Sequence, residues 1–276
     1  MFSFRGEARV YDNLARFGRG NGVDSGALRA RSRLPMLLLE ILEDIAKLAL
    51  SVAALYVGLR LVLRHRRPAW HDRVDQRRAA FVWLLMLGAS AVMVAEDALG
   101  GDSHLIDRHI LLFIREHLPA MLTLPFEWIT LSASGHVLTP LTFATSVALY
   151  FTRRRGDAVL VAGSVTCGAV LIYVLKSLVE RERPKLWAAE WYWGSSFPSG
   201  HTLAMASFAT AAALVIGRTW PALRVPALVL ALVWVLLVGF SRLVLGVHWP
   251  TDVLVAACIG AAIPLGFSFS LEHRRD

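Results

Sequence analysis

The sequence predicts an all-α, polytopic membrane protein: a transmembrane bundle of six core spans, preceded by one amphipathic or additional membrane helix. Three observations support this fold class. Of the 276 residues, 56% are hydrophobic, and the mean hydropathy is +0.53, too apolar for an ordinary soluble domain. Several apolar runs approach the roughly 20 residues that a helix needs to cross a bilayer. Basic residues gather in the segments between these runs.

The core spans are apolar segments of helical length, and each is bounded by polar residues. They are predicted at 79–95, 137–152, 158–175, 202–216, 225–240 and 253–271. A polar to amphipathic connector joins the first span to the second. The loop between the third and fourth spans holds four aromatic residues, as is typical of a membrane interface. They are Trp187, Trp191, Tyr192 and Trp193.

The amino-terminal part of the chain differs from the core. Residues 1–33 are rich in Arg and Gly, which favours a flexible basic cytoplasmic arm. Residues 34–78 hold a helix over 34–63 and a basic loop; acidic residues interrupt the helix, so it either spans the membrane or lies in the interface. Residues 79–271 are the membrane domain, and 272–276 form a cytoplasmic tail.

The loop charges predict a topology. The basic loops at 64–78, 153–155 and 218–224 belong in the cytoplasm, so the connector at 96–136 and the loop at 177–200 lie outside. If residues 34–63 crossed the membrane, the Arg-rich arm would be external, against the charge rule. An interfacial or re-entrant helix there is therefore favoured. The net charge of +8 is assigned to this asymmetry, and no nucleic-acid partner is expected.

Three polar segments interrupt the otherwise apolar chain, and they predict a functional site. Charged groups at membrane depth are costly, so a basic, histidine-bearing cluster at the ends of apolar helices indicates function. Under the predicted topology, all three segments fall on the external side. The residues concerned are Lys176, Arg183, Ser199, Gly200, His201, Arg242, His248 and Asp252.

Local spacing gives some of these residues a chemical role. Ser199 suits the N-cap of the fourth span, and Gly200 places exposed backbone N–H groups at a helix start, where a phosphate binds well. His248 and Asp252 are four apart across the first turn of the last span. They share a helix face, so Asp252 can hold one imidazole nitrogen while the other points into the site.

The motifs Lys-x6-Arg-Pro, Pro-Ser-Gly-His and Ser-Arg-x5-His-x3-Asp occur here in that order and complete. Together they resemble the type 2 phosphatidic acid phosphatase superfamily, in its membrane lipid phosphatase branch, over residues 79–271. The resemblance implies that His248, polarised by Asp252, attacks phosphorus, and that His201 is the general acid and base. The implied phosphate-binding residues are Lys176, Arg183, Ser199, Gly200 and Arg242.

The resemblance implies a lipid phosphatase of the inner or plasma membrane that acts through a phosphohistidine, with its site facing the periplasm or exterior. With three fixed cations, no metal or other cofactor is expected. The substrate is a lipid phosphate held in the bilayer: polyprenyl diphosphate, phosphatidic acid or a similar lipid. A phosphotransferase using the same phosphohistidine and a non-hydrolytic phospholipid-binding protein remain alternatives. The tail of the lipid and the oligomeric state are left open.

Other polar residues near the motifs have simpler interpretations. Arg181 and Lys185 are predicted to be ordinary interfacial charges, with Glu180 and Glu182 as solvated partners. The histidines of the outer connector lack the tight spacing of metal ligands and are predicted to be surface residues. For His201, His248 and Asp252, a buried network that only fixes helix packing would leave three nearby basic residues unexplained.

Overall fold

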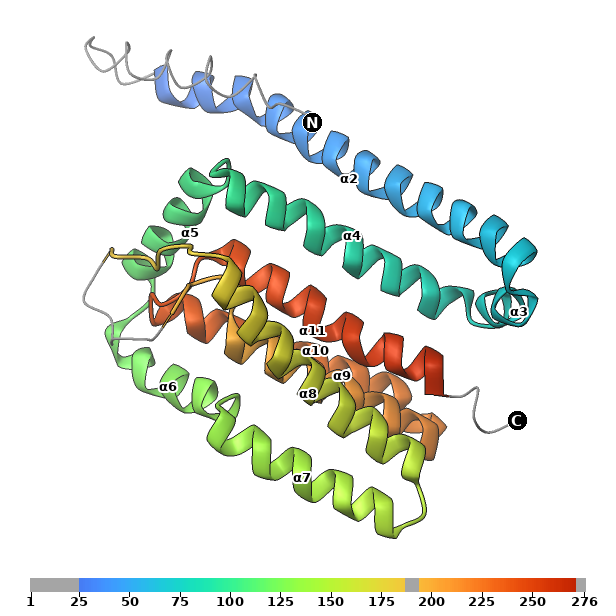
Figure 1. Ribbon diagram of the computed structural model, residues 1–276. Coiled ribbons are helices and arrows are strands. Elements are labelled where there is room, and N and C mark those ends of the chain that lie inside the picture. Colours follow the sequence, from blue (N-terminus) through green and yellow to red (C-terminus); the bar gives the residue numbers. More distant parts are fainter. Residues whose placement is uncertain (1–24, 187–193, 272–276) are drawn as a thin grey trace. The chain divides into compact units, whose positions relative to one another are not determined.

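The computed structural model describes residues 25–186 and 194–271, and all regular structure in these ranges is helical, as predicted (Figure 1). The predicted arm up to residue 24, the four aromatic residues of the 187–193 segment and the tail at 272–276 lie outside the described residues. The α-helices are α2 (Ser25–Arg66), α3 (Pro68–Gln76), α4 (Arg78–Gly100), α5 (His104–His117), α6 (Thr123–Ser132), α7 (Gly135–Phe151), α8 (Arg155–Leu178), α9 (Gly200–Thr219), α10 (Arg224–Val244) and α11 (Pro250–Leu271). Short 3-10 turns at Ala120–Leu122 and Pro221–Leu223 join α5 to α6 and α9 to α10.

The chain divides into two compact units, residues 1–50 and 51–276. In the first unit, Lys47 pairs with Glu43 at 2.9 Å on the exposed surface of α2. Helix α2 runs unbroken through 34–63, so the re-entrant form is wrong. Its segment Leu42–Arg66 is long and apolar enough to cross a membrane. Whether it spans or lies in the interface stays a prediction.

Five of the six predicted core spans coincide with helices that are long and apolar enough to cross a membrane. In the described part of the chain these are Arg78–Gly100, Arg155–Leu178, Gly200–Thr219, Pro221–Val244 and Pro250–Leu271. The remaining predicted span is α7, which has 17 residues. It is somewhat shorter than the roughly 20 residues of a full span. The chain is a multi-span membrane protein.

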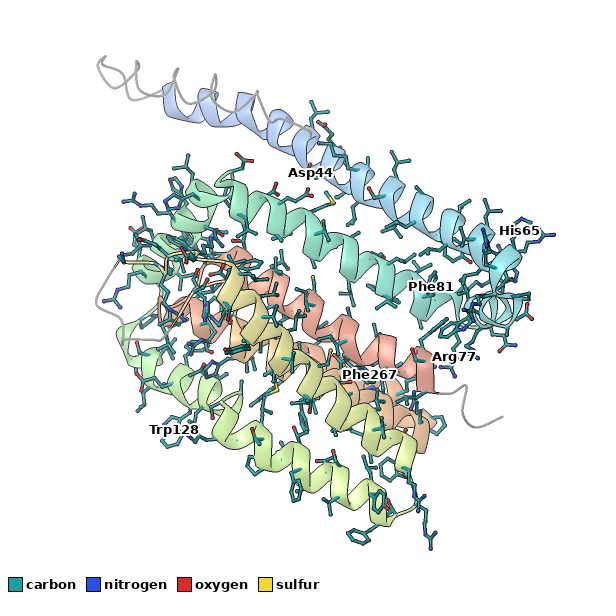
Figure 2. The ribbon with its side chains drawn as sticks, viewed as in Figure 1. Asp44, His65, Arg77, Phe81, Trp128 and Phe267 are labelled. Carbon is teal, nitrogen blue, oxygen red and sulfur yellow. The ribbon has the colours of Figure 1, made fainter. Side chains whose placement is uncertain are left out.

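The surface of the bundle agrees with a lipid environment. On α10, Leu230 is 66% exposed and Leu236 is 60% exposed, and large apolar side chains cover most other helices in the same way. Trp128 projects outward from α6 (Figure 2). A soluble protein rarely exposes so much contiguous apolar surface, whereas a bilayer solvates it.

Helix α9 is the centre of the second unit, because α7, α8, α10 and α11 all pack against it. Small residues allow the close approach. A Cβ added at Gly260 of α11 would lie 2.5 Å from the carbonyl oxygen of Leu203 and 2.6 Å from the Cβ of Ala206, both on α9. Small residues of this kind let membrane helices pack backbone against backbone.

This packing brings four helix ends together. The carboxyl ends of α8 and α10 and the amino ends of α9 and α11 lie at one end of the bundle, beside α5 (Figure 1). Pro250 is the first residue of α11, where its fixed φ suits a helix start and its missing N–H costs nothing. Arg77 marks the opposite end of the bundle, at the start of α4 (Figure 2). The motif segments therefore meet at the end away from Arg77.

We expect Gly260→Ala to destabilise the protein by about 1–3 kcal/mol, because the new methyl group has no room against the backbone of α9. The matched control is Gly266→Ala on the same helix, where an added Cβ meets nothing within 4 Å. Thermal unfolding in detergent, followed by circular dichroism, measures both. Equal transition temperatures for the two variants would contradict the close packing of α9 and α11.

Candidate active site

Arg183 lies beside His248 at the centre of the site. Its Nη1 is 3.4 Å from Nε2 of His248 and donates to the carbonyl oxygen of Val247 at 2.7 Å. Further hydrogen bonds run from its guanidinium to the carbonyls of Gly194 and Ser195, each at 3.3 Å. These backbone acceptors hold the guanidinium in place, so a fixed cation faces the same imidazole nitrogen that points into the site.

Two more predicted cations complete this cluster. Lys176, in the last turn of α8, donates from Nζ to the carbonyl of Ser195. Arg242, in the last turn of α10, is 1% exposed and donates to the hydroxyl of Thr130 at 2.7 Å. His201 interacts electrostatically with both of them, with Arg183 and with His248. The fold thus gathers three cations and two histidines from three segments of the chain, of which Arg183 and His248 are 65 residues apart.

His248 is 2% exposed, and Asp252 lies on the other side of its ring. The Nδ1 atom is 3.6 Å from Oδ2 of Asp252, beyond hydrogen-bond distance, and no hydrogen-bond partner for it is found among the described residues. The same carboxylate oxygen accepts the backbone N–H of Trp249 at 2.9 Å. Asp252 is therefore on the predicted side of the imidazole, at a distance that a small closure would turn into a hydrogen bond.

The protonation of His248 follows from its surroundings. Burial, together with the nearby cations Arg242 and Arg183, lowers the pKa of His248 to about 4, although Asp252 opposes the shift. Because the pKa is depressed, the imidazole is neutral at any pH well above 4. A proton on Nδ1, beside Asp252, would leave the lone pair of Nε2 facing Arg183.

At the start of α9, the groups of Ser199 and Gly200 that suit a role in the site are backbone N–H groups more than side chains. Ser199 is the N-cap residue, as predicted, but its hydroxyl lies 3.0 Å from the hydroxyl of Thr202 and caps no backbone N–H. Its own N–H donates to the carbonyl of Asp252 at 3.2 Å, which joins α9 to α11. Gly200 is the first residue of α9, where N–H groups lack partners within the helix and suit an anion.

The prediction that Arg181 is an ordinary interfacial charge is wrong. Its side chain is 12% exposed and forms an ion pair with Asp252, with 2.6 Å between Nη1 and Oδ1. A second ion pair joins its Nη2 to Oδ2 of Asp107 at 2.8 Å. Lys185, by contrast, pairs with Glu182 at 3.0 Å with both side chains more than three-quarters exposed, as predicted.

Asp107 of α5 is a site residue that the sequence interpretation missed. It is fully buried and accepts hydrogen bonds from the backbone N–H of Thr251 at 3.1 Å and from its hydroxyl at 2.7 Å. One signal was present in the sequence. Asp107 shares a face of the amphipathic helix with Leu111, also fully buried, and a carboxylate on an apolar face needs a buried partner.

Comparison with known proteins places the chain in a family. The model of the PAP2 superfamily matches residues 157–273, which hold all three motifs. A decaprenylphosphoryl-5-phosphoribose phosphatase of Mycobacterium tuberculosis is 33% identical over 180 residues, 64% of this chain and 86% of that protein. The chain belongs to the PAP2 superfamily.

Other PAP2 proteins match over different lengths. Phosphatidylglycerophosphatase B of Escherichia coli is 41% identical over 86 residues, 30% of this chain, and the match spans a third (33%) of that relative. The crystal structure of a transmembrane PAP2-type phosphatidylglycerolphosphate phosphatase from Bacillus subtilis aligns with a TM-score of 0.58 and 25% identity, over 72% of this chain and 96% of that one. The amino-terminal part of the chain lies outside the residues that the family model matches.

We expect His248 to stay neutral from pH 5 to 8, because its pKa is lowered to about 4. The measurement is a nuclear magnetic resonance titration of the protein labelled with ¹³C-histidine in detergent, with the resonance assigned from its loss in His248→Gln. A midpoint at or above the ordinary value of 6.5 would show that burial and the cations do not set the charge of His248.

Proposed function

We propose that this protein is an integral membrane lipid phosphatase that hydrolyses a phosphate monoester or diphosphate through a phosphohistidine. The observation that carries the proposal is the position of His248, whose Nε2 faces the guanidinium of Arg183 at 3.4 Å while Asp252 lies behind Nδ1. A neutral imidazole aimed at a cluster of cations is suited to attack a bound phosphoryl group.

The reaction has two steps. In the first, Nε2 of His248 attacks phosphorus, the bond to the leaving oxygen breaks, and protonated His201 gives that oxygen a proton. Asp252 balances the positive charge that develops on the imidazole of His248. In the second, His201 takes a proton from a water molecule while the oxygen of that water attacks phosphorus. The P–N bond then breaks, inorganic phosphate leaves and neutral His248 is restored. General acid and base catalysis of this kind contributes roughly 10²–10⁴-fold.

The cation cluster supplies the electrostatic part of the catalysis. Lys176, Arg183 and Arg242, with the N–H of Gly200, hold the non-bridging oxygens of the phosphate, and Ser199 adds its hydroxyl. Each such donor contributes on the order of 3 kcal/mol when it is fixed where charge develops. Arg binds two oxygens at once, whereas Lys acts as a point charge. These groups neutralise the phosphate without a metal ion.

The place of the site in the bundle supports a lipid substrate. The helix ends that form it lie where a span meets the headgroups, so a phosphate can enter while its lipid chain stays in the bilayer. The relatives' names point to lipid phosphates, and one of them, an undecaprenyl-diphosphatase of Sulfolobus acidocaldarius, is 27% identical over 195 residues. We favour polyprenyl diphosphate, or a broad range of lipid phosphates that includes phosphatidic acid.

The charges support a site on the external side of the inner or plasma membrane. The end of the bundle away from the site carries the basic segment around Arg77, the loop 153–155, and both Arg218 and Arg224. Excess Arg and Lys favours the cytoplasmic side. This charge distribution supports a position of the motif segments at the periplasmic or outer surface.

We expect the purified protein to release inorganic phosphate to water from at least one member of a panel of polyprenyl diphosphate, phosphatidic acid and phosphatidylglycerol phosphate, without any added acceptor. His248→Ala is expected to lower kcat by at least about 10³-fold, because the nucleophile is lost. Single-turnover assays with radiolabelled phosphate measure both release and the phosphoenzyme. His65→Ala, at the opposite end of the bundle, is the matched control and keeps full activity.

Each alternative function gives a different result. Phosphate transferred to an added lipid alcohol, with no release in its absence, would identify a phosphotransferase. Binding of the lipids without turnover would identify a non-hydrolytic protein. Activity that survives His248→Ala would remove the phosphohistidine mechanism.

We expect activity to persist within about twofold in excess EDTA, because three fixed cations neutralise the phosphate in the transition state. The assay compares initial rates before and after dialysis against chelator. Abolition by EDTA, with recovery on adding a divalent cation, would contradict metal-independent hydrolysis.

A further inference from the structure

We propose that Arg181 is a positioning residue which, together with Asp107, aims the carboxylate of Asp252 at His248. This inference rests on the proposed function, because it concerns the nucleophile of that reaction. It adds two residues outside the three motif patterns to the machinery of the site. It also makes α5, the amphipathic helix at the same end of the bundle, part of the catalytic support.

The guanidinium of Arg181 binds side chains through both of its terminal nitrogens. Its Nη1 donates to Oδ1 of Asp252 at 2.6 Å and to the hydroxyl of Thr251 at 2.8 Å. Its Nη2 donates to Oδ2 of Asp107 at 2.8 Å. Both terminal nitrogens therefore face α5 and α11. Arg183, two residues on, is the arginine that lies against Nε2 of His248.

The two carboxylate oxygens of Asp252 have different hydrogen-bond partners. Arg181 holds Oδ1, which leaves Oδ2 to accept the N–H of Trp249 and to face Nδ1 of His248 at 3.6 Å. Without Arg181, Oδ1 would lose this hydrogen bond, the carboxylate could rotate, and Oδ2 would no longer be directed at Nδ1. The imidazole would then lose the partner that balances its charge during attack.

Asp107, on α5, holds the start of α11, the helix that carries Asp252. Its Oδ1 accepts the backbone N–H of Thr251, and its Oδ2 accepts the hydroxyls of Thr251 and Ser103 as well as Arg181. A carboxylate at a helix amino end pairs with free N–H groups and with the positive end of the helix dipole. Asp107 thus anchors the first turn of α11, which carries Asp252 and directly follows His248.

The charges of Asp107 and Asp252 explain why an arginine lies between these two carboxylates. Asp107 and Asp252 are both fully buried, and a buried carboxylate without a partner is strongly destabilising. Arg181 forms an ion pair with each of them. Its planar fork reaches two carboxylates at once, whereas a lysine offers a single point of charge. Lys185 in the same segment is 77% exposed and pairs with Glu182, so it has no part in this arrangement.

The pH profile distinguishes positioning from simple scaffolding. The groups that act on His248 are Arg183 from the segment after α8, His201 of α9, Arg242 of α10 and Asp252 of α11. Lys176 of α8, Arg181 and Asp107 act on it through Asp252. Without Arg181, Oδ2 of Asp252 loses its direction, so Asp252 raises the pKa of His248 less and the acid limb of kcat/KM moves to lower pH. Removing the charge of Asp107 frees Arg181 to offset Asp252 and moves the limb to lower pH.

The experiment compares Arg181→Gln, Arg181→Lys and Asp107→Asn in the full-length protein in detergent, with Lys185→Gln as the control that removes an exposed cation from the same segment. We expect Arg181→Gln to lower kcat by about 10–100-fold, the size typical of lost support for a reactive group, with KM changed less than about threefold. Arg181→Lys is expected to recover part of the loss. Binding of orthovanadate, which probes the phosphate cradle, should stay within about threefold for every variant.

The result that supports the inference is a loss in kcat with the acid limb moved to lower pH in Arg181→Gln and Asp107→Asn, while Lys185→Gln behaves as the unaltered protein. Three results overturn it: Arg181→Gln indistinguishable from Lys185→Gln, an acid limb that stays or moves to higher pH in Arg181→Gln, or loss of vanadate binding together with activity. Loss of vanadate binding together with activity would show that Arg181 either binds the phosphate directly or is needed for folding. Activity that survives His248→Ala would instead overturn the proposed function, so the two failures are distinguishable.

Discussion

The ion pair between Asp252 and Arg181 is the interaction on which the arrangement of the site depends. Asp252 is completely buried at the start of a membrane helix, where an ionised carboxylate is stable only if it is paired and hydrogen-bonded. Arg181 and the N–H of Trp249 provide those partners. Once the carboxylate is held, the chain around residue 248 is fixed, and the imidazole stands between the carboxylate and the guanidinium of Arg183.

The membrane fold explains why such a polar site forms at one end of the bundle. Inside the bilayer, the helices approach closely through small residues: a Cβ at Gly239 of α10 would meet Val253 of α11 at 2.7 Å, just as Gly260 meets α9. These contacts hold α9, α10 and α11 in register without polar groups at depth. The costly charges are confined to the helix ends, where interfacial water and headgroups reduce their cost.

The motif residues were predictable from sequence because each carries local information. Gly200 marks a helix start, and His248 and Asp252 have the four-residue spacing of a helix face. Arg181 and Asp107 lacked that advantage. They are 74 residues apart, and only the folded chain shows that one guanidinium joins α5 to α11. Interfacial arginines are common, so Arg181 alone gave no reason to expect burial. The fold class followed from hydropathy, whereas the length of α7 and the continuity of α2 depended on packing and local geometry that periodicity does not report.

The electrostatics of the site favour a phosphate over other anions or neutral groups. Lys176, Arg183 and Arg242 repel one another, and Asp252, a carboxylate close to them, is already neutralised in part by Arg181. A phosphate carries enough negative charge to offset this excess, and its tetrahedral oxygens suit donors that converge from three helices. Burial, with Arg242 and Arg183, lowers the pKa of His248 and keeps it neutral. In the proposed reaction, one cluster therefore binds the substrate and holds the nucleophile in its reactive form, while the apolar surface of the spans leaves the lipid chain free to vary.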